Sequence, residues 1–273
     1  MMPTRTPCRA ALGLLLALSA DCAHAKPPPG YKLVWADEFS GSGLPRPGKW
    51  GYDTEANQSG WYNNELQYYA ADDRRYARRS NGKLVITARK QALVDRPDYG
   101  GQQYSSARLI TRGKASWTYG FLEIRAKLPC GLGTWPAIWM LGTQGAWPAA
   151  GEIDIMEHVG LTPGIIYGTV HDSATAGTPG NGGQTTVKTA CSRFHNYQLT
   201  WTSEQLDIAV DRKIFHTYRN DGGGPASWPF DQPQYLILNL AIGGDMAGPV
   251  VDDRIFPAKF IIDYVRVYQK KAQ

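Results

Sequence analysis

Three carboxylates lie within six residues of one apolar segment. The run Gly151–His158 reads Gly-Glu-Ile-Asp-Ile-Met-Glu-His, which places Glu152, Asp154 and Glu157 among isoleucine and methionine, in a chain that is only 19% charged. Three ionised acids at this spacing would repel one another, and the raised carboxyl pKa values that follow are what acid catalysis at neutral pH requires. The run therefore predicts general acid–base chemistry, with scattered acids on a solvated strand face as the alternative.

The alternation of apolar residues and acids favours a strand, and a strand imposes a geometric condition on the three acids. In a regular strand Glu152 and Asp154 point to one face, the next position on that face is Met156, and Glu157 points away. All three acids share a face only if a β-bulge inserts one residue near Ile155–Met156. The outer backbones would then lie about 13 Å apart, and inclined side chains would bring the carboxyls to about 5 Å, near the separation expected of a retaining glycosidase.

The amino-terminal 25 residues resemble a secretory leader. Arg5 and Arg9 form a basic start, Ala10–Ala20 is an apolar core, and Ala23-His24-Ala25 matches a cleavage site. The apolar core is too short to span a bilayer, and no later segment is apolar for long enough. We therefore expect export, to the outside or to the periplasm, after cleavage near Ala25, and no membrane partner.

The remaining residues, 26–273, show no break in composition, so we expect a single catalytic domain that is monomeric. Without the leader the formal charge is 27 − 23 = +4, and no dense basic run predicts a nucleic-acid partner. The sequence contains no CxxC or His-rich metal spacing, and we expect no cofactor for catalysis. Cys130 and Cys191 are the two cysteines left, which suggests a disulfide in an oxidising compartment, with two free thiols as the alternative.

Short β-prone segments follow one another along the chain. Glycine (30) and proline (18) are plentiful, and helical periodicity is missing. About a dozen strands without a composition break favour an all-β antiparallel sandwich or jelly roll. The long stretches 50–81 and 172–189 are expected to be irregular surface loops at the edge of a cleft. The clearest strand candidates are 84–88, 121–128, 165–170, 196–201, 206–210, 213–218, 235–242 and 264–268.

Tryptophan is abundant, with nine residues, and several lie next to glycine or asparagine instead of in apolar strands. Indole faces stack on the C–H faces of sugar rings while polar neighbours bind the hydroxyls. Trp135 and Trp139 precede the acid run and would line the same face from a neighbouring strand, although core packing is the alternative for each. His171 follows a strand candidate, where it would bind a carboxylate or a sugar hydroxyl, or serve a structural role.

Together these segments resemble glycoside hydrolase family 16. The acid run looks like the E-x-D-x-x-E signature of that family, and matching pieces cover nearly the whole chain after the leader. The resemblance implies a concanavalin-like β-jelly-roll sandwich of two antiparallel sheets with a concave substrate cleft, and retaining endo-hydrolysis of β-glucans. The other matching pieces are Trp35–Phe39, Asn63–Glu65, Ser106–Thr111, Tyr119–Gly120, Glu123–Pro129, Gly133–Trp139, Asn239–Gly244 and Asp263–Tyr268.

The residue inserted before the second glutamate is similar to the laminarinase-like branch of the family, whereas the lichenase branch has the shorter E-x-D-x-E. An endo-β-1,3-glucanase or β-1,3(4)-glucanase acting on a β-glucan polysaccharide is therefore the leading prediction. Agarases and carrageenases of the family also carry the longer motif. The same fold would also suit a transglycosylase that remodels β-glucan, or a glucan-binding protein that keeps the aromatic cleft.

The resemblance also implies roles for individual residues. Glu152 would be the nucleophile, Glu157 the general acid/base, and Asp154 would bind Glu152 and set its protonation state. The cleft would be lined by Asn64, Arg108, Trp135, Trp139 and His171.

The resemblance has two further implications, one for a stacking contact and one for a metal ion. The family often has a tryptophan two positions after the Gly243-Gly244 pair, and Met246 stands there, which puts one stacking contact in doubt. Members often hold a structural calcium ion on the convex face. Its ligands would be Glu38, the carbonyl of Gly82 and Asp263, and oxygen ligands suit Ca²⁺.

Overall fold

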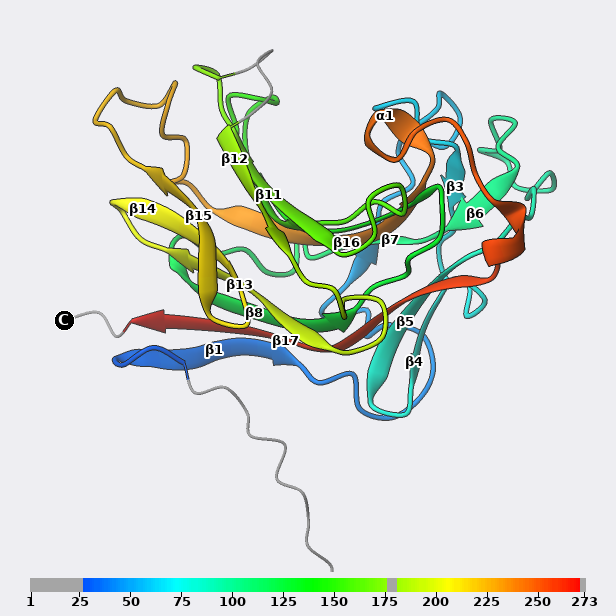
Figure 1. Cartoon of the computed structure of the whole chain (residues 1–273), viewed down its shortest axis with the longest axis horizontal. Coiled ribbons are helices and arrows are strands. Elements are labelled where there is room, and N and C mark those ends of the chain that lie inside the picture. Colours follow the sequence, from blue (N-terminus) through cyan, green and yellow to red (C-terminus); the bar gives the residue numbers. More distant parts are fainter. Residues whose placement is uncertain (1–26, 176–180, 271–273) are drawn as a thin grey trace, which may run out of the picture.

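The computed structural model describes residues 27–175 and 181–270, and its strands form two large antiparallel sheets that pack face to face (Figure 1). The first sheet has the order β15-β14-β13-β8-β17-β5-β4, with β1 also paired to β17. Its strands are β1 (Tyr31–Asp37), β4 (Ala77–Ser80), β5 (Lys83–Ala88), β8 (Gly120–Lys127), β13 (His195–Trp201), β14 (Gln205–Val210), β15 (Lys213–Arg219) and β17 (Ala258–Lys270).

The second sheet has the order β12-β11-β10-β9-β16-β7-β2 and carries the acid run on β10. Its strands are β2 (Gly51–Tyr52), β7 (Arg108–Ile110), β9 (Thr134–Gly142), β10 (Glu152–Glu157), β11 (Ile165–His171), β12 (Asn181–Thr186) and β16 (Gln234–Ile242). The remaining elements are the parallel pair β3 (Gln67–Tyr69) and β6 (Tyr104–Ser106), the short helix α1 (Gly244–Ala247) and the 3₁₀ turn η1 (Asp253–Ile255).

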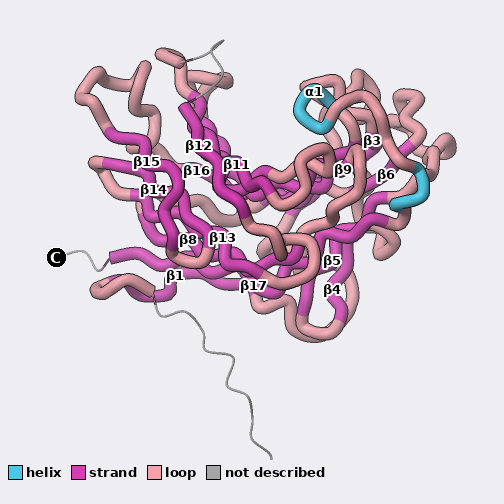
Figure 2. The backbone as a smooth tube through the Cα atoms, in the orientation of Figure 1, coloured by secondary structure: helices cyan, strands magenta, loops and turns pink. Residues whose placement is uncertain are grey.

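The second sheet curves away from the first. In Figure 1, β11 and β12 on one side and α1 on the other rise above β16 and β7, so the outer face of this sheet is concave. Figure 2 shows that nearly all of the described chain is strand or connecting loop. The structure therefore confirms the prediction of an all-β sandwich with a concave face.

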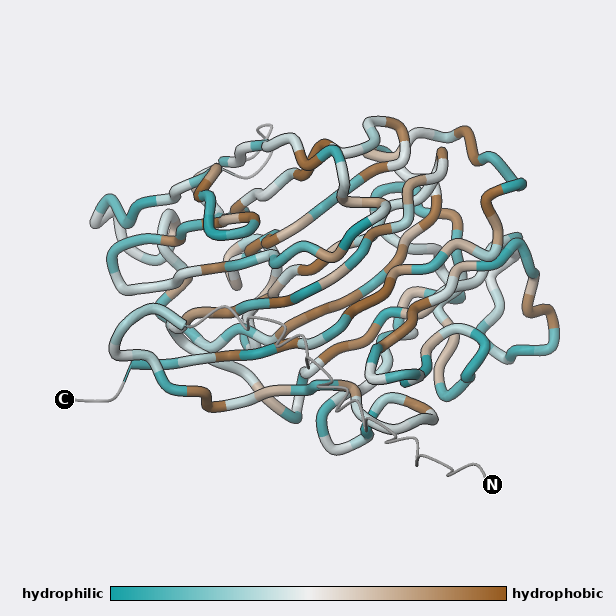
Figure 3. Tube along the Cα trace, turned by 60° about the horizontal axis from the view of Figure 1, so that its bottom comes forward, coloured by the Kyte–Doolittle hydropathy of each residue, from teal (hydrophilic) through white to brown (hydrophobic). Residues whose placement is uncertain are grey.

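The core lies between the two sheets and follows from strand alternation. All nine residues of β16 are buried. Leu236, Leu238 and Leu240 belong to the main core, whereas Tyr235 and Ile237 pack on the opposite, concave face. In Figure 3 hydrophobic segments run along the central strands, and hydrophilic segments concentrate in the loops around them. The concave face thus has an apolar floor of its own, supported from beneath by the core.

The strand candidates 206–210 and 213–218 form the hairpin of β14 and β15, which turns at Asp211-Arg212. Both turn residues have positive φ, 48° and 69°, which is the geometry of a two-residue turn whose twist matches the strands. The strand predicted over 121–128 is confirmed as β8, and Glu123 within it is fully buried. Its side-chain oxygens accept hydrogen bonds from Gln198 Nε2 (2.6 Å) and Tyr264 Oη (2.9 Å), so these buried polar atoms have partners.

Two expectations for the irregular stretches are wrong in part. The stretch 50–81 contains β2, β3 and β4, and the stretch 172–189 contains β12. β12 reads Asn-Gly-Gly-Gln-Thr-Thr, and it has no apolar alternation because it is an edge strand held by pairing with β11. The leader and its cleavage site lie outside the described residues. Within the described part of the chain, no helix is long and apolar enough to cross a membrane.

Candidate active site

β10 carries the predicted bulge at the predicted place. Asp154 lies opposite Trp139 of β9, and Met156 lies opposite the next residue, Ile138, so Ile155 is the extra residue. The pairing with β11 shifts over the same interval. Ile155 and Met156 are both fully buried in the core. The inserted residue returns Glu157 to the face of the sheet that carries Glu152 and Asp154.

Each of the three acids has a specific partner on the concave face. Trp147 Nε1 donates to Glu152 Oε2 at 2.6 Å, and Trp135 Nε1 donates to Glu157 Oε1 at 3.0 Å. Asp154, between them, lies with Oδ2 3.1 Å from His171 Nε2. An oxygen of Glu152, an oxygen of Asp154 and a ring nitrogen of His171 all lie within 4.8 Å of one another. The structure thus brings the predicted acids together with two of the predicted cleft residues, Trp135 and His171.

Burial and mutual repulsion hold protons on this cluster. Burial, and then the charge of Asp154, raises the pKa of Glu152 to about 8. Burial, together with the charges of Glu152 and Glu65, raises the pKa of Glu157 to about 7, against the opposing hydrogen bond from Trp135. Burial and the charge of Glu157 raise the pKa of Asp154 well above its usual range. At neutral pH the site therefore carries fewer than three negative charges and has a proton to give.

Trp139 lies at one wall of the site, and Arg108 lies behind it as a paired cation. Its guanidinium lies between the rings of Trp139 and Trp61, 4.7 and 4.9 Å from their centroids, and 2.9 Å from Asp53. The side chain is 9% exposed. The sequence predicted Arg108 as a cleft residue, and the structure places it behind the aromatic surface, where it supports Trp139.

Asn64 lies beside the end of β16, next to α1, in a turn of positive φ (55°). Its Nδ2 donates to Asp245 Oδ1 of α1 at 2.7 Å, which ties the turn to the helix. Met246 of the same helix packs beside the cluster that contains Trp135. The position where the family often has tryptophan therefore holds a flexible thioether against the wall near Glu157.

Glu65 is a fourth carboxylate near the site that was not among the predicted site residues. It accepts hydrogen bonds from Gln67 Nε2 (2.7 Å) and Tyr69 Oη (3.4 Å), and burial raises its pKa. Tyr69 in turn accepts from Asn239 Nδ2 at 3.0 Å. The Asn63-Asn64-Glu65 run was a modest sequence signal, and only the tertiary structure shows that the charge of its acid acts on Glu157.

Trp147 is the second residue that the sequence-based prediction of the site omitted. It lies in the loop before β10, five positions ahead of the carboxylate to which it donates, and its side chain is among the exposed large apolar groups. Its ring centroid is 6.3 Å from that of His171. Its closeness in sequence to Glu152 was the available signal, but a loop of this kind has no periodicity from which the direction of the indole follows.

The three residues proposed for calcium do not form a ready ligand set in the structure. Glu38 accepts from Arg266 Nε and Nη2 at 2.7 and 2.8 Å. Asp263 is paired with Arg125 (2.5 Å) and Lys83 (3.3 Å). Gly82 lies in the turn between β4 and β5. Because both carboxylates already have cationic partners, the residues as placed do not fit a calcium ion, and the calcium site stays a prediction.

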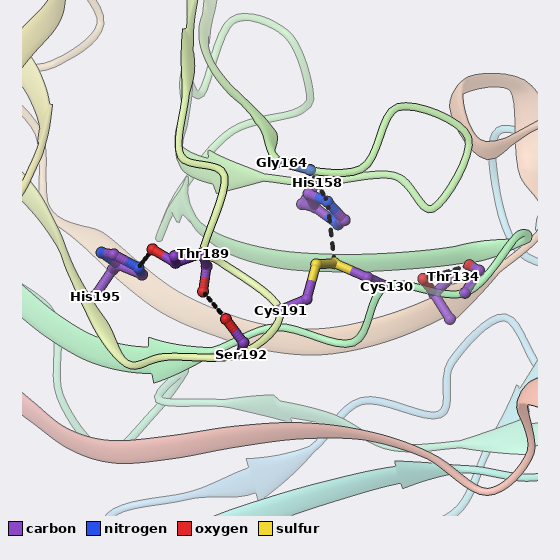
Figure 4. The surroundings of a disulfide bond; sticks show 9 residues. Cys130, Thr134, His158, Gly164, Thr189, Cys191, Ser192 and His195 are labelled. Carbon is purple, nitrogen blue, oxygen red and sulfur yellow. Dashed lines mark hydrogen bonds between the residues drawn. A yellow bond between two sulfur atoms is a disulfide. The ribbon is translucent and has the colours of Figure 1, made fainter.

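The predicted disulfide joins Cys130 and Cys191, whose Cα atoms lie 5.6 Å apart (Figure 4). It links the loop before β9 to the loop before β13. His158, the residue after Glu157, lies against it, with Nε2 3.5 Å from Cys130 Sγ and accepting from the Gly164 N–H at 3.1 Å. Burial lowers the pKa of His158 to about 4, so this imidazole is neutral and structural.

Comparisons with family models, curated proteins and solved structures agree with one another. Residues 64–265 match the model of glycosyl hydrolases family 16. A β-glucanase of Rhodothermus marinus is 49% identical over 88% of this chain and 86% of its own length. A solved non-specific endo-β-1,3(4)-glucanase with 1,3-β-D-cellobiosyl-glucose at its active site is 52% identical, with a TM-score of 0.86 over 90% of this chain and 97% of that one. The laminarinase structure from Rhodothermus marinus is 47% identical, with a TM-score of 0.81 over 88% and 97%.

Proposed function

The chain belongs to glycosyl hydrolase family 16, and on that basis we propose that it is an endo-β-1,3(4)-glucanase that cleaves laminarin-type β-glucan with retention of configuration. The observation that carries the proposal is the bulged strand β10, which presents Glu152, Asp154 and Glu157 on one face. The pKa values of these carboxyl groups are raised, so the cluster retains protons at neutral pH. The names of the similar proteins support the substrate class.

The proposed reaction is a double displacement. Glu157 protonates the glycosidic oxygen while Glu152 attacks the anomeric carbon, so that the C–O bond breaks as a glycosyl ester forms. Glu157, now ionised, then takes a proton from water as the water attacks the ester, which restores both carboxyl groups. A proton returns to the same residue that released it, so no external acid is consumed.

The two roles are assigned from the match to the motif of the family, because the proton affinities of the free protein do not separate them in that order. In the free protein the pKa of Glu152, about 8, lies above that of Glu157, about 7, which is opposite to the order that catalysis needs. The three acids share protons, so these values belong to the cluster. Each outer carboxylate has one indole donor, Trp147 for Glu152 and Trp135 for Glu157, and the contact with Asp154 raises the pKa of Glu152 further.

The walls around the acids suit a sugar chain. Trp139 is partly exposed beside the carboxylates, Trp135 packs its ring in a small buried cluster, and Asn64 supplies an amide at the rim. Apolar ring faces with a few polar groups are the usual composition of a sugar-binding cleft. We also propose that the enzyme is exported after loss of the leader.

Reducing-sugar release on a panel of laminarin, lichenan, curdlan, agarose and carrageenan tests the proposal. The wild type should release oligosaccharides from laminarin, curdlan and lichenan, and Glu152→Gln should release almost none. Binding of laminarin by the wild type without release of sugar would overturn the enzymatic function in favour of a glucan-binding protein. Mainly elongated products from a labelled acceptor would show a transglycosylase instead of a hydrolase.

A further inference from the structure

A hollow of about 180 Å³ lies on the concave face beside the nucleophile, lined by Arg112, Leu141, Thr143, Trp147 and Tyr235 among others. Its position follows from the strand register. Leu141 lies directly opposite Glu152, and Tyr235 lies directly opposite Leu141 on the next strand. Residues paired in this way point to the same face of a sheet. The hollow therefore begins one strand away from Glu152, on the same surface.

The lining has the chemistry of a site for a neutral sugar. Trp147 is 58% exposed, so its ring is available for stacking, and Tyr235 forms part of the apolar floor. The Arg112 guanidinium lies 5.7 Å from the centre of the Tyr235 ring and is also paired with Glu55. Because Glu55 balances its charge, Arg112 offers N–H donors without demanding an anion. Aromatic faces with a few directed donors match the C–H faces and hydroxyls of a glucosyl unit.

The loop that carries Trp147 is fixed at both ends. The Thr143 N–H donates to the Pro233 carbonyl at 2.9 Å, and the Gly142 N–H donates to the Gly151 carbonyl at 3.2 Å. Gly151 has a φ of 76°, and a Cβ there would lie 2.8 Å from Pro229 and 2.9 Å from Phe230. A residue other than glycine would therefore be strained as well as crowded. The loop holds the indole in a defined place, with its N–H on Glu152 and the rest of the side chain lining the hollow.

We propose that this hollow is a further glucosyl-binding subsite, and that Trp147 couples its occupancy to the position of the nucleophile Glu152. The inference rests on the proposed glucanase function. A glucosyl unit in the hollow packs on the Trp147 ring and restrains it, and the indole N–H then holds the Glu152 carboxylate in place for attack. Binding energy from a remote sugar thereby lowers the barrier of the chemical step. Longer chains should therefore have a higher kcat as well as a lower KM.

Steady-state kinetics on β-1,3-linked glucose oligosaccharides of increasing length test this coupling. For the wild type, kcat should rise about tenfold at the chain length that first fills the hollow. Arg112→Ala should lose that rise and keep the kcat of the shorter substrates. Trp147→Phe keeps a ring but removes the N–H, and it should lower kcat at every length and displace the pH profile of kcat, because the indole N–H lowers the pKa of Glu152.

Glu55→Gln is the matched control, because it breaks the same ion pair but leaves the Arg112 guanidinium in the hollow. It should follow the wild type at every chain length. The subsite is refuted if Arg112→Ala retains the wild-type dependence of kcat on length, or if Glu55→Gln loses it. The coupling is refuted if Trp147→Phe changes KM alone with an unaltered pH profile. A wild type that cleaves none of the oligosaccharides would instead overturn the glucanase function itself.

Discussion

Trp135 donates its indole N–H to Glu157 across neighbouring strands, at 3.0 Å. Trp147 makes the same kind of contact with Glu152 from a loop, at 2.6 Å. The two outer carboxylates are therefore each held by an indole nitrogen, and the central Asp154 faces His171. The tryptophans beside the acids therefore orient the two carboxylates that the proposed reaction uses.

The Trp135–Glu157 contact predicts the behaviour of Trp135→Phe, which keeps an aromatic ring but removes the donor. The indole N–H favours the ionised carboxylate and lowers the pKa of Glu157. Its loss should raise that pKa, move the alkaline limb of kcat/KM to higher pH, and lower kcat by about tenfold, because Glu157 becomes a weaker acid toward the glycosidic oxygen. Unaltered pH dependence, with only KM changed, would show that Trp135 serves stacking alone.

The raised pKa of Glu157 also predicts a pH-dependent stability change in Glu157→Gln. The pKa is about 7 in the folded protein and 4.5 ordinarily, so the folded state binds more protons between these values and loses stability as pH rises through them. At pH 8 glutamine removes the buried charge and should stabilise the protein by about 2–3 kcal/mol. At pH 4 the variant and the wild type should be alike.

Thermal unfolding at the two pH values measures this difference, with an increase of about 4–8 °C in Tm expected at pH 8 only. Glu55→Gln is a suitable control, since its carboxylate is 70% exposed. A Glu157→Gln variant that melts below the wild type at pH 8 would contradict the proton-holding role of the site.

The bulge on β10 could be predicted from sequence because side-chain alternation is strict: three acids in a 1-3-6 pattern share a face only with one inserted residue. The positions of most strands followed from the same alternation. The environment of Arg108 could not be predicted, because its charge is balanced by Asp53, 55 positions earlier in the chain. Trp147 and Glu65 were missed for a similar reason, since both come from loops whose direction depends on tertiary contacts.

Deletion of Met156 should abolish the bulge and turn Glu157 to the regular alternation of a shorter motif. Misplacement of the acid by an ångström or more should lower activity on laminarin by at least about tenfold. Met156 is fully buried, so the deletion should also cost about 2–4 kcal/mol of stability without unfolding the protein.

Met156→Leu is the control for this experiment. It conserves the bulge and nearly the same volume, and it should leave activity and stability close to those of the wild type. Laminarin assays and urea unfolding on both variants measure the two effects separately. Full activity of the deletion variant would mean that the bulge does not place Glu157.

The Cys130–Cys191 bond closes a segment of 61 residues, so its removal should lower stability. Chain entropy gives about 4 kcal/mol for a loop of this size. Urea unfolding of the Cys130→Ser/Cys191→Ser double variant, compared with the wild type with and without a thiol reductant, measures the loss. Reductant should destabilise the wild type and leave the double variant unchanged, and a wild type insensitive to reductant after unfolding would contradict the bond.

The anomeric configuration of the first product tests the central claim most directly. Proton NMR can follow cleavage of a β-1,3-linked glucose hexasaccharide in the minutes before mutarotation equilibrates the anomers. Attack by Glu152 followed by water activated by Glu157 predicts that the new reducing end appears first as the β-anomer and then converts to α. First appearance of the α-anomer would show direct attack by water and would contradict the roles assigned to the carboxylates of β10.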